Sequence, residues 1–236
     1  MLSATEEKKD HPAIFNMDII ERLREIICDE VERQKVNLNI LDPMAGIGRI
    51  HLLGGSYHAG LDDWGGVHVN TWGVELEPEW ATQHPKTDVC DARSLQFTDG
   101  TFDAIITSPP YGNRMADHHN AKDSSTRITY KHKLGRDLTE GNTGGMQWGE
   151  DYKQTMWEIW QECDRVLRPG GLFVVNVKNH IRNFQIQRVV EWHLTKLLAL
   201  GNLIVEILQV PCDGMGYGAN REARVEAEHI IVTRKP

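Results

Sequence analysis

Apolar residues recur along the chain in two alternating patterns, one with the spacing of a helix and one with that of a strand. Residues 17–34 predict an amphipathic helix, because the apolar positions lie on one face: Ile19, Ile20, Leu23, Ile26, Ile27 and Val31. The same spacing predicts helices at about 152–167 and 184–200. Short apolar runs predict seven strands, at residues 36–43, 71–78, 87–92, 102–110, 172–177, 202–210 and 227–233.

The alternation of strands and helices favours a parallel sheet with helices on both faces. The continuous apolar run at 172–177 fits a strand buried on both sides, and the preceding "RPGG", Arg168 to Gly171, predicts a stop and a turn. The last two strands have no room for a crossover helix between them, so the last strand should run antiparallel to its neighbour. We expect one α/β domain over residues 1–236, with a doubly wound, mostly parallel seven-stranded sheet and an antiparallel last strand.

Three segments are not needed for this minimal alternation of strands and helices, at 51–69, 112–150 and 211–225. In an open parallel sheet, ligands bind beyond the carboxyl ends of the strands. The second and third segments leave such strand ends, so we expect both to touch a substrate, with 112–150 as the substrate-side insertion. The first segment follows a helix and leads into a strand, so we expect it at the opposite edge with a structural role.

The composition is that of a globular chain of 236 residues, 40% hydrophobic, without the roughly 18 consecutive apolar residues of a membrane span. The polar N-terminus has no signal-peptide core, so we expect a cytoplasmic protein with no membrane partner. The four cysteines form no CxxC pair, and three lie in apolar surroundings, which predicts buried thiols in a reducing compartment. Only His118 and His119 are adjacent among eleven histidines, without other ligands at metal spacing, so we expect no metal site.

Three strand ends carry residues with binding chemistry. Gly46 and Gly48, in "ILDPMAGIGRI", permit a tight turn and a close ligand approach before the next helix. No Gly-Lys-Ser/Thr follows them, and the third glycine of a dinucleotide loop is missing, so neither motif is present. Glu75 ends the second strand, where a carboxylate can take both ribose hydroxyls, and Asp91 ends the third, where it could accept from an adenine amine. A strand-end glutamate and a loop-capping aspartate are the structural alternatives.

The fourth strand ends in "SPPYG", where two prolines can extend neither a strand nor a helix. The Ser108 hydroxyl and the Pro109 carbonyl are two acceptors for the N–H bonds of an exocyclic amine, whose lone pair is otherwise delocalised into its base. Tyr111 offers a ring face for that base, which must first leave the helix stack. A Pro-Pro turn with a packed tyrosine is the structural alternative.

These stretches together resemble a known family. "DPMAGIG", "GVELE", "CDA" and "SPPYG" look like motifs I to IV of the class I S-adenosylmethionine-dependent amino-methyltransferases that act on nucleic acids, which have a Rossmann-like fold. The resemblance covers nearly the whole chain, because "LRPGG", the closing hairpin and "HPAIF" at 11–15 also match. The chain departs from the family at Met44, where phenylalanine is common, and at Arg49, where threonine or serine is common.

The resemblance implies S-adenosylmethionine as the cofactor. Its methionine end would lie on Asp42 and the loop 45–48, its ribose on Glu75 and its adenine amine on Asp91, beneath the segment 11–15. The implied cofactor residues are Phe15, Asp42, Met44, Ala45, Gly46, Gly48, Glu75, Leu76, Asp91 and Ala92. The implied catalytic residues, which hold the target amine, are Ser108, Pro109, Pro110 and Tyr111.

Nucleic-acid contact should be local, since the net charge is -8 and broad phosphate binding needs a basic surface. The strongest basic patch is "RITYKHKLGR" at 127–136, which holds no acid; a solvated loop is its structural alternative. "GYGANR" at 216–221 could form a second substrate loop. The expected nucleic-acid residues are Arg114, Arg127, Tyr130, Lys131, Lys133, Arg136, Asn220 and Arg221.

The sequence therefore predicts a methyltransferase that modifies an exocyclic amine of a base in DNA, at cytosine N4 or adenine N6. Ser108 rather than aspartate resembles the cytosine group, but serine both donates and accepts hydrogen bonds and so leaves both bases open. Methylation of an RNA base is one alternative, and a non-catalytic cofactor-fold module that binds nucleic acid or a partner is another. The sequence does not specify the oligomeric state.

Overall fold

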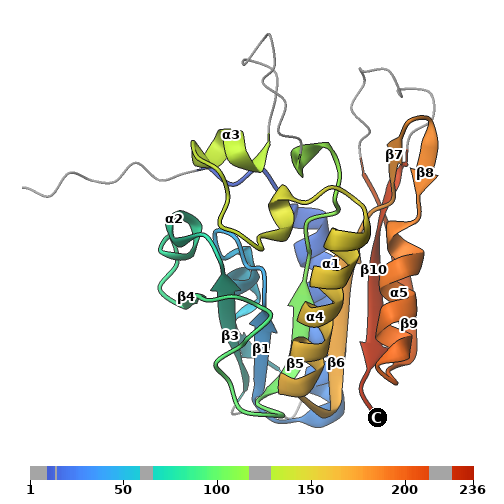
Figure 1. The fold of residues 1–236 in the computed structure, drawn as a ribbon. Helices are drawn as coiled ribbons and strands as arrows, with labels where there is room; N and C mark the ends of the chain where they lie inside the picture. The colour runs from blue at the N-terminus through green and yellow to red at the C-terminus, as the bar shows by residue number, and fades with distance from the viewer. Residues whose placement is uncertain (1–9, 14, 59–65, 117–128, 213–224) are drawn as a thin grey trace, which may run out of the picture.

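A twisted eight-stranded sheet between layers of helices forms the core of the protein (Figure 1). The computed structural model describes residues 10–13, 15–58, 66–116, 129–212 and 225–236. In spatial order the strands are β2 (Gly55–Tyr57), β3 (Val67–Glu75), β1 (Leu38–Asp42), β5 (Phe102–Thr107), β6 (Leu167–Val177), β10 (Ala227–Arg234) and β9 (Leu203–Pro211), and β4 (Thr87–Val89) also pairs with β3.

The direction of the strands follows the predicted plan. β3, β1, β5 and β6 are parallel neighbours, β4 is parallel to β3, and β10 runs antiparallel to both β6 and β9. The predicted α/β fold class, with its mostly parallel sheet and antiparallel last strand, is therefore confirmed. The eighth strand is β2, a three-residue strand antiparallel to β3, too short to leave a hydrophobic pattern in the sequence.

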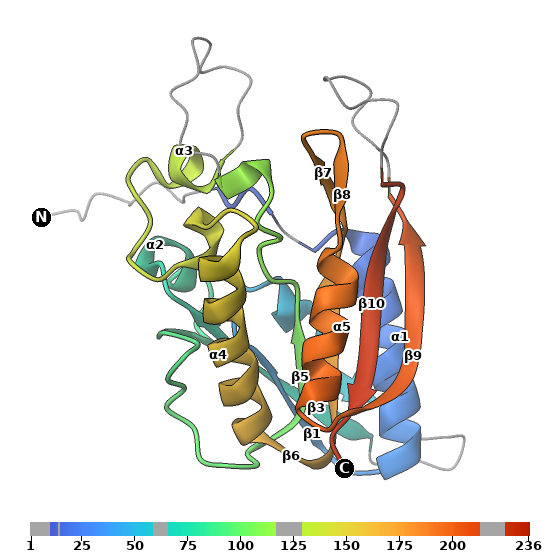
Figure 2. The same cartoon turned by 45° about the vertical axis from the view of Figure 1, so that its right-hand side comes forward.

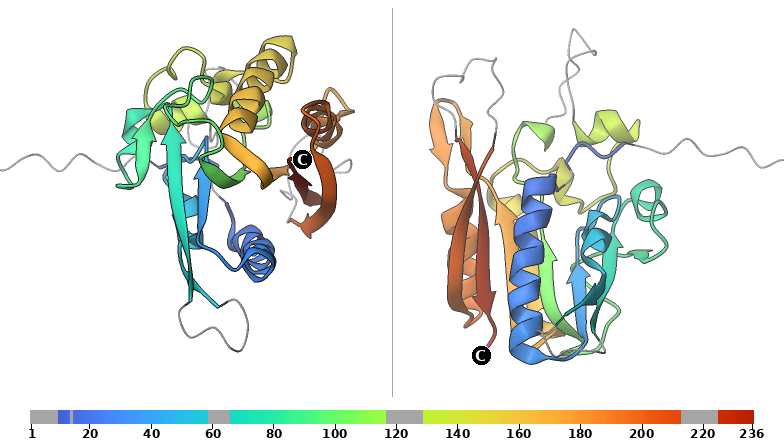
Figure 3. Two further views of the ribbon diagram at one scale, coloured as in Figure 1. Left: turned by 90° about the horizontal axis from the view of Figure 1, so that it is seen from below. Right: turned by 180° about the vertical axis from the view of Figure 1, so that it is seen from behind.

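The helices cover both faces of the sheet (Figure 3). Helix α1 (Met17–Gln34) lies on one face, and α4 (Glu150–Val166) and α5 (Val189–Ala199) lie on the other. Side chains alternate between the faces along each strand: in β1, Ile40 packs in the core beneath α1, and Leu41 packs in the core beneath α4. The side chain of Asn16 caps α1 by accepting from the backbone N–H of Ile19 at 2.8 Å.

Two local predictions are wrong. The helix expected at 184–200 begins only at Val189, because β7 (His180–Arg182) and β8 (Gln185–Gln187) form a hairpin whose turn residues Asn183 and Phe184 have positive φ angles. This hairpin rises above α5 (Figure 2). The glycine loop leads into a five-residue 3-10 helix, η1 (Arg49–Leu53), and not into an α-helix.

Two further predictions are wrong, the turn at Arg168 to Gly171 and the burial of three cysteines. β6 already begins at Leu167, and its pairing with β5 shifts register there, so "RPGG" forms the irregular start of a strand.

Only Cys163 of the four cysteines is buried. Cys28 is exposed because it lies one position past the buried Ile27, turned about 100° around the helix toward solvent.

The segment between β5 and α4 lies above the carboxyl ends of the parallel strands (Figures 1 and 2). Its described elements are η2 (Arg114–Ala116), α3 (Tyr130–Leu134) and η3 (Thr143–Gly145), and a short helix α2 (Pro78–Ala81) follows β3. The expected substrate loop at 216–221 lies outside the described residues. No helix in the described part of the chain is long and apolar enough to cross a membrane.

One buried carboxylate joins α1 to the end of the sheet. Glu30 is 4% exposed and accepts hydrogen bonds from Arg33 on its own helix and from Arg234 on β10, at 2.6 to 3.0 Å. Burial by itself raises the pKa of Glu30, but the hydrogen bonds from the two arginines outweigh it and lower the pKa to about 2. The ionised form of Glu30 therefore stabilises the fold.

Replacing Glu30 with glutamine should lower the free energy of unfolding by about 2 kcal/mol, because two guanidinium groups lose their common anion. Urea unfolding at pH 7 measures this loss. The matched control is Glu25→Gln, whose partner Arg22 is also more than half exposed, so its change should stay within about 0.5 kcal/mol. An equal effect of the two variants would contradict the role of Glu30.

The contribution of Glu30 should also depend on pH in one direction. Its folded-state pKa lies below the usual value of 4.5, so its stabilisation is fully present above pH 4.5 and is lost as the pH falls toward 2. The difference in unfolding free energy between the wild type and Glu30→Gln should shrink over that range.

Candidate active site

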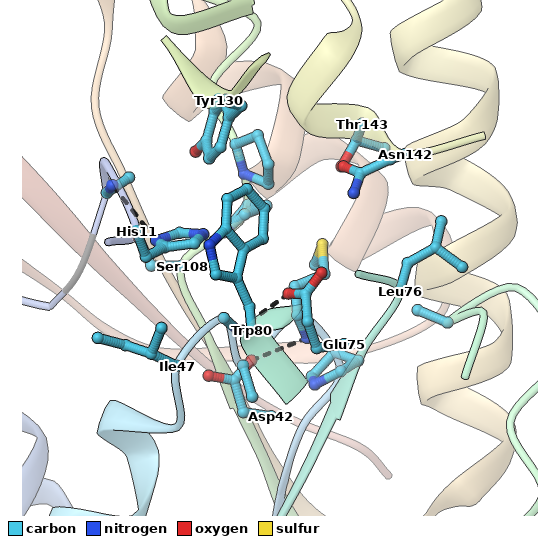
Figure 4. Close-up of a pocket in the computed structure, with 18 of the residues that line it drawn as sticks. His11, Asp42, Ile47, Glu75, Leu76, Trp80, Ser108, Tyr130, Asn142 and Thr143 are labelled. Atoms are coloured by element: carbon cyan, nitrogen blue, oxygen red, sulfur yellow. Dashed lines mark hydrogen bonds between the residues drawn. The ribbon is translucent and has the colours of Figure 1, made fainter. Parts of the chain in front are cut away.

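A pocket of about 330 Å³ opens at the carboxyl edge of the parallel strands (Figure 4). It collects residues from segments that are far apart in the chain. The residues expected at the cofactor and the target amine that line it are Phe15, Asp42, Met44, Ala45, Gly46, Glu75, Leu76, Asp91, Ala92, Ser108, Pro109, Pro110 and Tyr111. The structure thus brings together nearly all the residues that the motifs single out.

The two glycines of the loop after β1 have different roles. Gly46 has a φ of 54°, its N–H donates to Oε2 of Glu75 at 3.0 Å, and a Cβ there would lie 3.2 Å from the ring of His11. Gly48 has a φ of 83°, and a Cβ there would lie 2.8 Å from Cβ of His84, so glycine permits a turn packed against His84. Gly48 is not among the residues that line the pocket, and its expected contact with the cofactor stays a prediction.

Two buried carboxylates form the floor of the pocket. Asp42, 1% exposed, accepts from the N–H of Met44 at 3.0 Å, and Glu75, 7% exposed, accepts from the N–H groups of Gly46 and Glu77 at 3.0 Å each. Burial raises the pKa of each acid to about 7. Buried acids with raised pKa values in a cleft are typical of a binding site, and their charge favours a cationic ligand.

An aromatic wall stands opposite the carboxylates. The rings of His11 and Trp80 meet edge to face with centroids 4.5 Å apart, and Trp80 and Tyr130 meet in the same way at 6.1 Å. Burial lowers the pKa of His11 to about 4, so its imidazole is neutral at pH 7. Tyr130, expected to touch nucleic acid, is only 5% exposed and lines the pocket, because its apolar ring packs on Trp80.

The described cations of the basic segment that contains Tyr130 form ion pairs with nearby acids. Lys131 pairs with Asp137 at 2.5 Å and Lys133 pairs with Asp10 at 2.9 Å. Arg136 pairs with both Glu77 and Glu79, at 2.7 and 2.6 Å. Asp137 directly follows the segment, whereas Asp10, Glu77 and Glu79 are distant in the sequence, so the three described cations of "RITYKHKLGR" are paired in the folded protein.

The remaining expected nucleic-acid residues receive no structural support. Arg114 begins η2, and Arg127, Asn220 and Arg221 lie outside the described residues. Their contact with nucleic acid stays a prediction. Within the described part of the chain, no group of three or more histidine, cysteine or acidic side chains is placed to hold a metal ion.

Sequence reasoning missed Glu77, which organises the rim of the pocket. Its carboxylate is 0% exposed and accepts from Arg136, from the N–H and hydroxyl of Thr139, and from the amide of Asn142, at 2.7 to 3.1 Å. Asn142 and its neighbours Gly141 and Thr143 line the pocket. Glu77 therefore holds the insertion against the end of β3. In the sequence, its position two residues after Glu75 was the signal that could have identified it.

Asp91 lines the pocket in an ion pair with Arg93, whose guanidinium lies 2.6 Å from its carboxylate. Burial by itself raises the pKa of Asp91, but the hydrogen bonds from Arg93 lower it below its usual value. Asp91 is thus an ionised acceptor at the end of β4.

The Ser-Pro-Pro-Tyr segment forms a polar cluster with two residues that the motifs did not indicate. Oγ of Ser108 lies 3.0 Å from the hydroxyl of Tyr111. The amide of Asn176 on β6 donates to Glu228 on β10 at 2.7 Å and to Ser108 at 3.3 Å. Asparagine within the apolar run "LFVVNV" was a sequence signal for Asn176, whereas nothing in the sequence placed Glu228 beside it.

Comparison with known proteins gives one family and many structures of similar fold. A model of the N6 and N4 methyltransferases, described as DNA methylase, matches residues 102–236. No curated protein matches the chain.

Among solved structures, an S-adenosylmethionine-dependent methyltransferase from Methanosarcina mazei is 13% identical, with 84% of this chain and 92% of that chain covered and a TM-score of 0.50. A putative sarcosine dimethylglycine methyltransferase from Galdieria sulphuraria is 11% identical, with 96% and 94% covered and a TM-score of 0.52. A putative DNA modification methylase from Thermus thermophilus, in complex with S-adenosylmethionine, is 18% identical with a TM-score of 0.40, and the match covers 62% of this chain and 53% of that one. At these identities, the first two likenesses show the fold alone.

Replacing Arg136 with glutamine should loosen the rim of the pocket, because the fully buried Glu77 loses its cationic partner. We expect the free energy of unfolding to fall by about 1–2 kcal/mol, since the other donors to Glu77 remain, and the affinity for S-adenosylmethionine to fall with it. Lys131→Gln, which breaks only the exposed pair with Asp137, is the matched control. Calorimetric titration would contradict the role of Arg136 if both variants bound the cofactor like the wild type.

Proposed function

The chain belongs to the DNA methylase family of N6 and N4 methyltransferases, and we propose that its pocket holds S-adenosylmethionine beside a flipped-out base. The membership confirms the predicted enzyme class, a DNA methyltransferase that uses S-adenosylmethionine as its cofactor. The roles of individual residues and the choice of base are our proposal. One observation carries it: the buried acids of β1 and β3 and the Ser-Pro-Pro-Tyr segment of β5 line the same pocket.

The residues of the pocket fit the cofactor in size, charge and donor chemistry. Its volume of about 330 Å³ lies within the range of small-molecule sites. Glu75 would take the ribose hydroxyls, Asp91 the adenine amine, and Asp42 with the loop at Gly46 the methionine end. S-adenosylmethionine supplies a methyl group bound to a positively charged sulfur, and Asp42 and Glu75 would offset that charge. The neutral ring of His11 adds no opposing charge.

The Ser-Pro-Pro-Tyr segment would position the amine that receives the methyl group. The carbonyl of Pro110 already accepts from the hydroxyl of Tyr152, which fixes the turn and leaves the Pro109 carbonyl and Ser108 as the two acceptors. Both N–H bonds of the amine would then be held, and its lone pair would point at the methyl group. Alignment of this kind is a large part of catalysis between two bound reactants.

The target base stays open between cytosine and adenine, because both carry an exocyclic amine next to an unprotonated ring nitrogen. We propose that DNA approaches over the insertion at 112–150, since this segment lies above the pocket. Its paired lysines and Arg136 offer less free charge than the sequence suggested. The preference for DNA over RNA and the cytoplasmic location are further expectations, which the family membership leaves open.

Incubating the protein with labelled S-adenosylmethionine and DNA or RNA tests the function, with the product nucleoside identified by mass spectrometry. We expect N4-methylcytosine or N6-methyladenine in DNA. Ser108→Ala should lower kcat about 100-fold, the scale for losing one positioned hydrogen-bond partner, with unchanged cofactor affinity. Ser94→Ala, at an exposed serine, is the control. Full activity of Ser108→Ala would contradict the assigned role of the motif.

Cofactor binding should release protons near pH 7. Burial raises the pKa of Glu75 to about 7, so much of this acid is protonated in the free protein, while hydroxyl donors on the ligand favour the carboxylate. The affinity should therefore weaken as the pH falls below 7. Calorimetry in buffers of different ionisation enthalpy measures the released protons. Glu75→Gln should release fewer, and Asp88→Asn, at an exposed position of β4, should release as many as the wild type.

A further inference from the structure

We propose that Glu228 accepts the proton that the target amine loses on methylation, reached from Ser108 through the hydroxyl of Tyr111. This inference rests on the proposed function of the pocket and adds a residue to it. Glu228 stands at the start of β10, beside Asn176 on the neighbouring strand β6, and lines the pocket together with Ser108 and Tyr111.

The hydrogen bonds form a continuous path. Oγ of Ser108 and the hydroxyl oxygen of Tyr111 lie 3.0 Å apart, and the hydroxyl of Tyr111 donates to Oε2 of Glu228 at 3.4 Å. The amide of Asn176 donates to the same oxygen at 2.7 Å and lies 3.3 Å from Ser108. Asn176 is 2% exposed, so it holds both ends of the path in a fixed arrangement.

The carboxylate sets the direction of the protons along this path. An ionised carboxylate only accepts hydrogen bonds, so Tyr111 gives its one proton to Glu228 and accepts that of Ser108. Ser108 accepts from Asn176 and keeps a second lone pair for an N–H of the target amine. Burial, and then the charge of Glu228, raise the pKa of Tyr111 well above its usual value, so the phenol stays protonated and remains a donor.

Glu228 also connects the pocket to the outside. An open cavity on the edge formed by β9, β10 and the start of α1 is lined by Asn16, Lys178, Gln209, Glu226 and Glu228, among others. Within the described part of the chain, Glu228 is the only residue that lines both this cavity and the pocket. A proton taken up by Glu228 can therefore leave to solvent without passing the bound base.

The proton balance of the reaction requires such an acceptor. The amine nitrogen forms a bond to the methyl carbon as the carbon–sulfur bond breaks, and that electron pair stays on sulfur. The nitrogen then carries one positive charge and one proton too many. Ser108 takes this proton as its own passes to Tyr111, and the proton of Tyr111 passes to Glu228. Ser108 and Tyr111 end neutral, the product amine is neutral, and the carboxylate has become a carboxylic acid.

In this arrangement, Glu228 supplies the negative charge that an aspartate would bring to the motif and that Ser108 does not carry. Aspartate at the first position of the motif would bring an ionised acceptor directly to the amine, whereas a serine hydroxyl is neutral and holds its own proton. Here the negative charge stands behind the serine, on Glu228. The serine motif and Glu228 would then form one functional unit.

The first test replaces Glu228 with glutamine, which keeps an acceptor for Asn176 but cannot take up a proton. We expect kcat on DNA to fall about 100-fold, the lower end of the range for general acid–base catalysis, with unchanged calorimetric affinity for S-adenosylmethionine. Glu206→Gln, at an exposed acid of β9, should keep the wild-type kcat. Wild-type kcat in Glu228→Gln would overturn the inference alone, whereas a wild-type protein that methylates no base amine in DNA would overturn the proposed function.

The second test moves the charge back to the motif. Ser108→Asp in the Glu228→Gln background should recover at least several-fold in kcat, whereas Ser108→Asp beside an intact Glu228 should be less active than the wild type, because two carboxylates then share the site. No recovery would count against the relay.

A third readout needs neither cofactor nor DNA. Urea unfolding of Tyr111→Phe, Glu228→Gln and the double variant should give non-additive losses of stability, as expected for two groups joined by one hydrogen bond. Additive losses would show that Tyr111 and Glu228 are not coupled, and would overturn the path.

Discussion

The site depends on one constraint, that carboxylates buried at the ends of strands must be fully hydrogen-bonded. Glu75 and Glu77 stand two residues apart at the end of β3, and both are almost inaccessible to solvent. Glu75 accepts from the glycine loop after β1, and Glu77 accepts from the insertion between β5 and α4. The backbone N–H of Glu77 also donates to Glu75, so the two acids join the floor of the pocket to its rim.

The same constraint explains why the pocket is built from distant segments. Each buried acid needs several donors, and a short turn of chain cannot supply them all. Glu77 therefore draws in Arg136, Thr139 and Asn142, some sixty residues further along the chain. Glu228, which is only partly buried, also accepts from Asn176 and Tyr111, which come from other segments. The insertion contributes to the site because it carries the hydrogen-bond donors to Glu77, and the last strand contributes because it carries Glu228.

The sequence was sufficient for the fold because its signals are local. Apolar periodicity located α1, α4 and the seven main strands, and strand-end motifs located the floor of the pocket. The failures arose where long-range contact decides the outcome. The hairpin of β7 and β8 interrupts a helical pattern at 184–188, and Tyr130 packs against the distant Trp80 as well as against Leu134 on its own helix.

The basic segment at 127–136, whose contact with nucleic acid stays a prediction, also bears on how this methylase binds DNA. Counting the charged residues of a segment gives its formal charge. In the folded protein, only the charges that are not paired with opposite charges remain available to a ligand. Arg136 forms ion pairs with two acids, and Lys131 and Lys133 form one ion pair each. Phosphate contact would have to displace those pairs, which weakens the electrostatic part of binding on a chain of net charge -8. On the proposed function, the pocket, with its two acceptors and aromatic ring for the target base, would then provide a larger share of the recognition.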